Sequence, residues 1–175
     1  MIEILALFFT LLSVYLTFKS NRYCWIFGFI GVCFYSIIFF LNRDWVNMSL
    51  QSVFAFQSIS GWFKWNDNKI KTSYLSNRWL FLLIFPIWII LYLGSKYFNG
   101  SDLVLDSLTS SLGILAVYLT SNKKVESWII WSICDLFLVF LFIKNDLYLS
   151  SILYFVFLII SILGFFKWRR DIEIH

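Results

Sequence analysis

The sequence is poor in charge. Only 14% of its 175 residues are Asp, Glu, Lys or Arg, whereas 61% are hydrophobic and 22% are aromatic. A water-soluble domain of this size could not bury so much apolar surface in one core, so we expect most of the chain to face lipid. The chain also lacks a GxxxxGK phosphate loop and an HExxH motif, and its one histidine is His175. We therefore expect no ATP-driven pumping, no bound metal or cofactor, and no enzymatic activity.

Cysteine is also scarce. Cys24, Cys33 and Cys134 fall inside apolar stretches, and their odd number argues against a disulfide framework, so we expect small buried packing residues. No basic segment precedes the first apolar stretch, which begins next to Glu3. We therefore expect that stretch to be a membrane helix and not a cleaved signal.

Long apolar stretches dominate what is present. A helix needs about 20 apolar residues to cross a bilayer. Seven stretches approach this length: Ile2 to Phe18, Tyr23 to Leu41, Trp45 to Trp62, Trp79 to Tyr97, Leu103 to Ser121, Ser127 to Ile143 and Leu147 to Phe166. They predict an all-α membrane protein with seven transmembrane helices and almost no residues left for a soluble domain.

The cations are unevenly distributed between the two predicted sides of the membrane. The side that carries the N-terminus holds only Arg43, Lys96 and Lys144 of the 14 Lys and Arg residues. By the positive-inside rule, the N-terminus is expected outside and the C-terminus in the cytoplasm. We interpret the basic clusters as charges that hold these loops at the cytoplasmic leaflet, and we expect no nucleic-acid partner.

An internal repeat organises the chain. The letters VYLT occur at residues 14–17 and again at 117–120, and pairing residues 2–65 with 105–168 gives 21 identities in 64 positions. This biased composition would give about six by chance, so the match indicates duplication. Each copy contains three helices, and the unmatched fourth helix restores the direction of the chain between them. We predict a 3+1+3 parallel repeat, the plan of full-length SWEET-like transporters, with substrate bound between the repeats. Its parts are residues 1–66 (first repeat), 67–101 (linker with the fourth helix), 102–168 (second repeat) and 169–175 (cytoplasmic tail).

Asp135 is the sharpest polar signal inside a predicted span. It lies in the middle of the sixth stretch, in WSICDLFLVF, with no Lys or Arg close in sequence. Such residues are costly in a membrane and mark a substrate pathway or a helix contact. The carboxyl is either neutral and bonded to a backbone carbonyl, or balanced by a partner in space or by a cationic substrate. Its repeat mate is Val32, so the two halves differ here, as a site for an asymmetric ligand requires.

Other polar candidates lie on the third and seventh stretches. Asn47, Gln51 and Ser58 share one helical face, with Gln57 beside them. The matched positions of the seventh stretch repeat this spacing with Ser150, Tyr154 and Ser161. These side chains bind substrate or join helices through hydrogen bonds that contribute only about 0.6 kcal/mol on average in a membrane.

Tryptophans cluster near the cytoplasmic ends of the predicted spans. For Trp65 and Trp168 we favour an interfacial aromatic belt. Trp62 and Trp131 lie about one turn deeper, and their faces could stack on a flat heteroaromatic or cationic ring. Trp128 is a further candidate in the same region.

Several motifs together resemble one family. QSVFAFQSISGWFKW in the third stretch, NKKVESWIIW before the sixth, the Asp106-Ser107 pair and the final LGFFKW are similar to the nicotinamide riboside transporter PnuC family of bacterial inner-membrane vitamin transporters. The resemblance extends from the first stretch to Trp168. Gln51, Trp62, Trp65, Trp128 and Trp131 occupy matching family positions.

The resemblance implies a seven-helix SWEET-like fold, a homotrimer with a separate pathway in each subunit, and facilitated diffusion of nicotinamide riboside that a cytosolic kinase then traps. Two positions depart from the family: Asp135 and Leu163 stand where Asn is expected. Thiamine, also a cation, is the runner-up substrate, and riboflavin and nucleosides are further candidates. A SWEET-type sugar carrier and a non-transporting membrane scaffold are the alternatives from other classes.

Overall fold

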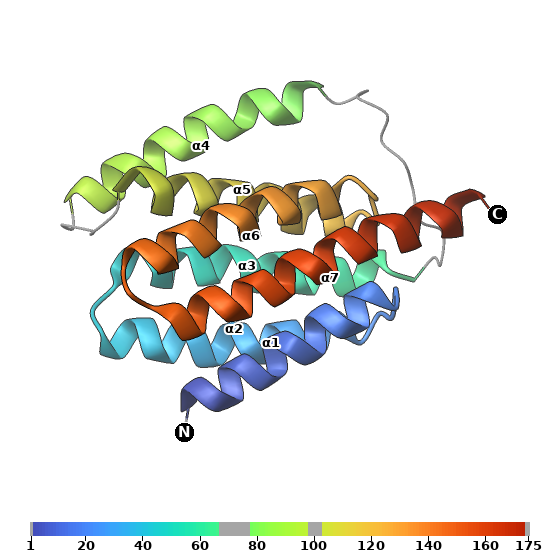
Figure 1. The fold of residues 1–175 in the computed structure, drawn as a ribbon, viewed down its shortest axis with the longest axis horizontal. Helices are drawn as coiled ribbons and strands as arrows, with labels where there is room; N and C mark the ends of the chain where they lie inside the picture. The colour runs from blue at the N-terminus through green and yellow to red at the C-terminus, as the bar shows by residue number, and fades with distance from the viewer. Residues whose placement is uncertain (1, 67–77, 98–102, 174–175) are drawn as a thin grey trace. The chain divides into compact units, whose positions relative to one another are not determined.

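The computed structural model describes residues 2–66, 78–97 and 103–173, and every regular element among them is a helix (Figure 1). The seven helices are α1 (Ile2–Phe18), α2 (Cys24–Leu41), α3 (Trp45–Lys64), α4 (Arg78–Tyr97), α5 (Leu103–Ser121), α6 (Ser127–Lys144) and α7 (Tyr148–Glu173). Each of the seven predicted stretches is therefore confirmed as a helix. The largest difference is at the end of α7, which continues to Glu173 and includes most of the predicted tail.

Four of these helices contain segments that are long and apolar enough to cross a membrane: Cys24–Leu41, Val104–Ser121, Ser127–Lys144 and Ser150–Ile172. Helix α1 and the segment Ile84–Tyr97 of α4 are apolar but shorter. Helix α3 is continuous, but polar residues such as Gln51 and Gln57 lower its hydropathy. The structure thus confirms an all-helical chain with several apolar helices.

The chain forms two compact units, residues 1–69 and 70–175. In the first unit, α2 packs against both α1 and α3. In the second unit, α6 packs against both α5 and α7, and α4 packs against α5. The finer division into two repeats, a linker and a tail stays a prediction. Residues 67–77 and 98–101 of that linker, which include Lys69 and Lys71, lie outside the described residues.

Four helix ends close with the same backbone turn. The left-handed residues are Ser20 and Lys123 (φ 55° and 52°), and Arg43 and Asp146 (both φ 57°). Each donates its N–H to the carbonyl three residues earlier, and the following N–H reaches the carbonyl five residues before it, as in a Schellman motif. The members of each pair are 103 residues apart, so the sequence repeat extends to the turns between helices.

A tryptophan packs directly on a glycine in both units. Trp25 of α2 lies against Gly61 of α3, and Trp128 of α6 lies against Gly164 of α7. In each case a second tryptophan completes the contact: the Trp25–Trp65 and Trp128–Trp168 ring centroids are both 5.4 Å apart, with the planes at 90°. This edge-to-face geometry is favourable for aromatic pairs.

The interfacial-belt interpretation of Trp65 and Trp168 is wrong. Their side chains are only 2% and 0% exposed, so neither offers its ring to a lipid headgroup region. Both indoles are packing residues: Trp65 fixes α2 against the end of α3, and Trp168 fixes α6 against α7.

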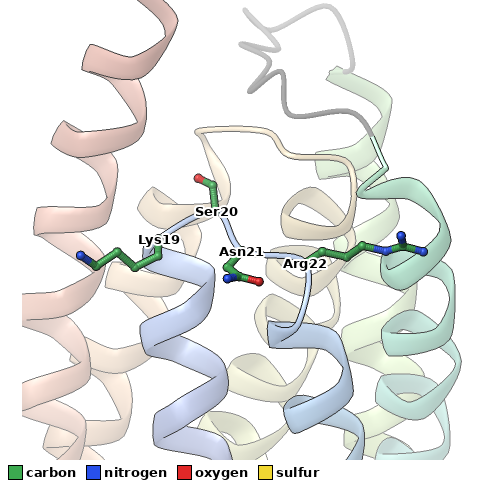
Figure 2. Close-up of a pocket in the computed structure, with 4 residues that line it drawn as sticks. All are labelled: Lys19, Ser20, Asn21 and Arg22. Atoms are coloured by element: carbon green, nitrogen blue, oxygen red, sulfur yellow. The ribbon is translucent and has the colours of Figure 1, made fainter.

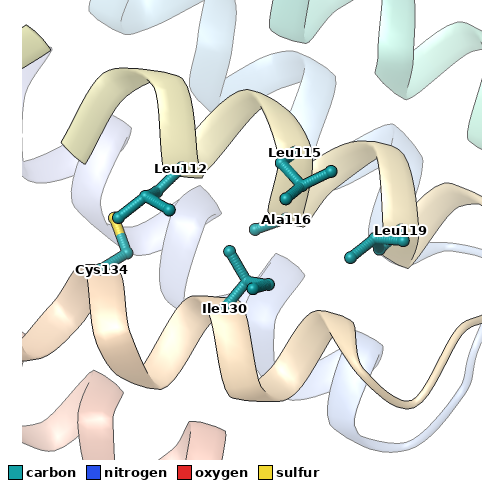
Figure 3. Close-up of a cluster of buried hydrophobic side chains, with 6 residues drawn as sticks. All are labelled: Leu112, Leu115, Ala116, Leu119, Ile130 and Cys134. Atoms are coloured by element: carbon teal, nitrogen blue, oxygen red, sulfur yellow. The ribbon is translucent and has the colours of Figure 1, made fainter. Parts of the chain in front are cut away.

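A cluster of apolar side chains joins α5 to α6 in the second unit (Figure 3). Its buried members are Leu112, Leu115, Ala116, Leu119, Ile130 and Cys134. The expectation of buried cysteines outside a disulfide framework is correct for Cys134 and Cys24, whereas Cys33 is also outside a disulfide but is exposed.

Candidate functional site

A buried carboxylate and a hydroxyl meet between α6 and α7. Asp135 is 4% exposed, and its Oδ2 accepts a hydrogen bond of 2.9 Å from Ser161 Oγ. Ser161 is also 4% exposed. The partner of the carboxyl is thus a side-chain hydroxyl and not the backbone carbonyl considered from the sequence. Within the described residues no Lys or Arg pairs with Asp135.

The first unit shows what this serine does when no carboxylate is present. Ser58 occupies the repeat position of Ser161, and Val32 that of Asp135. The Ser58 hydroxyl donates 2.8 Å to Phe54 O on its own helix. Serine hydroxyls in helices commonly bond the carbonyl four residues earlier, so Ser161 is the member of the pair that has been redirected toward another helix.

Replacing Ser161 by alanine is expected to lower the stability of the protein, because it removes a hydrogen bond between two helices from a buried carboxylate. Such bonds contribute about 0.6 to 1.7 kcal/mol in membrane proteins. Ser58→Ala is the matched control, since it removes only a bond within one helix. Thermal unfolding in detergent should show a decrease of several degrees for Ser161→Ala and almost none for Ser58→Ala. Equal shifts would contradict a special role for Ser161.

Trp131 lies one helical turn before Asp135 on α6, so both side chains share one helical face. Its Nε1–H donates 3.2 Å to Thr120 Oγ1 of α5, and the Thr120 hydroxyl donates 2.8 Å to Ala116 O. These bonds fix the orientation of the indole. A carboxylate and an oriented indole on one face form a combination that suits a cationic ring.

The first unit has no aromatic ring at the position of Trp131. Gly28 stands there, and a Cβ at Gly28 would lie 2.9 Å from Ser13 Oγ. The two units therefore share a backbone plan but differ at the two positions that carry the indole and the carboxylate.

The other polar candidates have different surroundings. Gln51 is 8% exposed, and its amide makes no hydrogen bond within the described residues. Gln57 is half-buried on the same helix. Tyr154 stacks on Phe142 of α6, with centroids 5.1 Å apart and planes at 19°. Amide and phenol groups of this kind can orient a ligand through hydrogen bonds.

Asn47 has a structural task at the start of α3. Asp44 is the N-cap residue: its carboxylate accepts 3.1 Å from the Asn47 backbone N–H and 2.7 Å from Asn47 Nδ2. The Asn47 amide is thereby engaged in capping the helix.

Trp62, at the end of α3, is covered by a cation. The Arg22 guanidinium lies 3.9 Å from the centre of the Trp62 ring, and Arg22 Nε donates 2.8 Å to Trp62 O. The Tyr23 ring is also close, at 5.8 Å. Trp65 and Trp128, in contrast, are enclosed by packing.

An open hollow of about 450 Å³ lies at the turn between α1 and α2 and is lined by Lys19, Ser20, Asn21 and Arg22 (Figure 2). The four side chains point in different directions, and that of Arg22 extends toward α3. Because no two of them converge, this hollow is not the candidate site. Among the described residues, no group of three or more His, Cys, Asp or Glu side chains could hold a metal ion.

Asp135 and Trp131 lie one turn apart on α6, where Asp135 accepts a hydrogen bond from Ser161 of α7 and Trp131 donates one to Thr120 of α5. Gln51, Gln57 and Trp62 belong to the first unit. Ser161, a polar candidate of the seventh stretch, joins two helices through its bond to Asp135. The contact between Arg22 and Trp62 is not predicted by the sequence, in which Arg22 is only one charge of a basic cluster. The unpaired Asp135 was the signal that a polar partner had to exist on a neighbouring helix.

Comparison with known proteins gives consistent matches. The model of the family described as "Nicotinamide mononucleotide transporter" matches residues 1–170. Proteins of Escherichia coli (strain K12) and Shigella flexneri named "Nicotinamide riboside transporter PnuC" are each 25% identical over 176 residues, which cover 81% of this chain and 74% of the relative. A solved structure described as "Crystal structure of the Vitamin B3 transporter PnuC" aligns with a TM-score of 0.72 and 22% identity. That alignment covers 98% of this chain and 81% of the other, and it shows a common fold.

Proposed function

Because the chain belongs to the nicotinamide mononucleotide transporter family, we propose that it carries nicotinamide riboside across the bacterial inner membrane. The names of the relatives support this substrate class. In this proposal all seven helices span the bilayer, with the N-terminus outside and the C-terminus in the cytoplasm, and the two three-helix segments are parallel repeats of a SWEET-like carrier.

The exposed surface of α3 supports membrane insertion even of this more polar helix. Phe56 and Phe63, seven residues apart on one face, are 73% and 70% exposed, whereas Gln51 and Ser58 are buried. In water such large exposed aromatic side chains would be unfavourable, but in a bilayer they contact lipid. The polar face of α3 is then directed toward the protein.

The observation that carries the substrate proposal is the buried carboxylate of Asp135. An ionised carboxylate in a membrane interior needs a compensating charge, and within the described residues no cation supplies one. Nicotinamide riboside brings a positively charged pyridinium ring. Asp135 would neutralise it, Trp131 would stack on it, and Tyr154 offers a phenol for the ribose hydroxyls or the carboxamide. Gln51 and Gln57, both on α3, remain proposed substrate residues of the first unit.

Thiamine is the second candidate, and the same observation favours it. Its thiazolium ring is also a cation, and Asp135 is a departure from the Asn expected in the family.

The proposed set of substrate residues is completed by Asn47, Trp62, Trp65 and Trp128. The surroundings of Asn47, Trp65 and Trp128 favour supporting roles.

Calorimetric titration of the purified protein with nicotinamide riboside and with thiamine tests the proposal. We expect saturable binding of the riboside and weaker binding of thiamine. The reverse order would make the protein a thiamine carrier, and flux of glucose or sucrose without binding of either cation would indicate a sugar carrier. If neither binding nor flux of any of these compounds is found, the protein would be assigned as a non-transporting membrane scaffold.

Facilitated diffusion and trapping are tested separately. In proteoliposomes without an energy source, labelled riboside is expected to equilibrate and to exchange with unlabelled riboside. Enclosing a nicotinamide riboside kinase with ATP should then produce accumulation above the external concentration. Accumulation without the kinase would contradict facilitated diffusion.

We also propose that the protein is a homotrimer with one pathway per subunit. The mass of the detergent-solubilised protein tests this oligomeric state.

A further inference from the structure

The face of Trp62 is already occupied by a positive charge. The Arg22 guanidinium lies 3.9 Å from the centre of the ring, which is the arrangement that an aromatic face provides for a cationic ligand. Two further contacts hold it there: Nε donates 2.8 Å to Trp62 O, and Nη1 lies 3.4 Å from Asn66 Oδ1. The side chain that reaches Trp62 starts from the turn between α1 and α2 (Figure 2).

The contact to Trp62 O has an ordinary structural explanation. The last carbonyls of a helix have no partner within it, and an Arg near the C-terminus can satisfy one of them. This explanation accounts for the bond from Nε. It does not account for the placement of the guanidinium on the ring face.

The second unit shows that the fold does not need this pair. At the repeat positions of Arg22 and Trp62 it has Val125 and Phe165, so both members are apolar there. The turn is nevertheless the same, with Ser20 and Lys123 both left-handed. The combination of a cation and an indole is therefore a feature of the first unit alone and is not required to close the turn.

We propose that the Arg22 guanidinium competes with the transported substrate for the face of Trp62: it covers the indole until a cationic ring displaces it. This inference rests on the proposed function, because it assigns Trp62 to the same cationic substrate. Since the cargo ring and the guanidinium need the same surface, only one can occupy it. Displacement also breaks the bond to Trp62 O, and this releases the α1–α2 turn from the end of α3. Arrival of cargo is thereby linked to loosening of one end of the first unit.

The variant Arg22→Gln tests this competition. Glutamine keeps a donor for Trp62 O but removes the charge from the ring face. We expect the affinity for nicotinamide riboside to increase by about 3- to 30-fold, the range that corresponds to loss of a competing cation–π contact. Lys19→Gln is the matched control, because it removes one positive charge from the same turn without touching Trp62, and it should leave the affinity unchanged.

A double-mutant cycle separates competition from helix capping. In a Trp62→Phe background the indole face is weakened as a cation site, so Arg22→Gln should then change the affinity by less than twofold. If Arg22 acted only as a cap, its replacement would have the same effect in both backgrounds and would lower thermal stability. The double variant Arg22→Val/Trp62→Phe copies the second unit and keeps the test available if a single variant is unstable.

Fluorescence quenching gives a readout that does not depend on transport. N-methylpyridinium is expected to quench the Trp62 fraction of the emission, defined by difference from Trp62→Phe, several-fold more strongly in Arg22→Gln than in the unmodified protein. Unchanged quenching and unchanged affinity would overturn the proposal even if riboside transport is found. Increased quenching in a protein that neither binds nor carries the riboside would keep Arg22 as the cover of Trp62 and overturn the substrate instead.

Discussion

Replacement of Asp135 by asparagine is expected to weaken nicotinamide riboside binding by about 100-fold, the largest functional effect of any single substitution in this chain. The buried carboxylate accepts a hydrogen bond from Ser161, and no cation of the described residues pairs with it. A bound pyridinium would complete an ion pair in a low-dielectric interior. Removing one member of a buried pair costs about 3 kcal/mol or more, which corresponds to about two orders of magnitude in affinity.

Asparagine is the most informative replacement because it keeps the shape of the side chain. Its carbonyl oxygen can still accept the hydrogen bond from Ser161, so the contact between α6 and α7 is preserved. Titration calorimetry measures the loss of affinity, and thermal unfolding should show that the fold is retained. Asp146→Asn is the matched control, since Asp146 is exposed and its carboxylate bonds only Tyr148, at 2.9 Å.

Two results would contradict the role of Asp135. Unchanged affinity for the riboside would show that the pyridinium is neutralised elsewhere. Improved stability of Asp135→Leu with unchanged transport would show that the carboxyl has no task in the protein, because removal of an idle buried charge stabilises. A selective loss of thiamine binding in Asp135→Asn would retain its role as counter-ion but change the cargo.

The helices could be predicted from the sequence because their signal is local. Apolar stretches of about the right length, separated by short polar turns, correspond to α1–α7, and the largest difference is the extension of α7 to Glu173. The repeat spacing of 103 residues also recurs in the left-handed turns at Ser20 and Lys123 and at Arg43 and Asp146. One to three polar residues separate each of them from the apolar run before it, and it is there that a helix end needs a turn.

The partners of the site residues could not be predicted, because they depend on tertiary contacts. Ser58 and Ser161 are identical in the alignment of the repeats, yet one bonds its own backbone and the other a carboxylate on the next helix. The positive-inside rule already predicts a positive charge in the segment that contains Arg22, so its charge alone gave no reason to expect a contact with Trp62. Asp135 itself stood out because a membrane interior makes an ionisable residue expensive wherever it lies.

The tryptophans show a further limit of local signals. Trp65 and Trp168 lie near helix ends, where both an interfacial belt and helix packing place tryptophan. The information that separates the two was present in the sequence as a glycine four residues earlier in both repeats, Gly61 and Gly164. A glycine one turn away leaves space for an aromatic ring from another helix. The orthogonal contact of two indoles at each glycine uses that space.

Alanine at Gly61 or Gly164 is expected to produce the largest losses of stability. A Cβ at Gly164 would lie 2.6 Å from Trp128 Cδ2, and one at Gly61 would overlap the Trp25 ring even more closely. Neither indole can move aside easily, since each is buried and locked against a second tryptophan. Overpacking typically costs about 1 to 3 kcal/mol and occasionally more, and a rigid indole at this distance is expected near the upper end. Thermal unfolding temperature and folded yield in the membrane should therefore both fall sharply.

Gly94 provides the matched control, because a Cβ there meets nothing within 4 Å. Alanine is the better helix former by about 0.5 to 1 kcal/mol, so Gly94→Ala should be neutral or slightly stabilising. The sign of the effect therefore separates steric overlap from helix propensity. If overlap with the indole is the cause, adding Trp25→Phe to Gly61→Ala should recover part of the lost stability, although Trp25→Phe alone destabilises. Additive losses in the double variant would show that the glycine is needed for another reason.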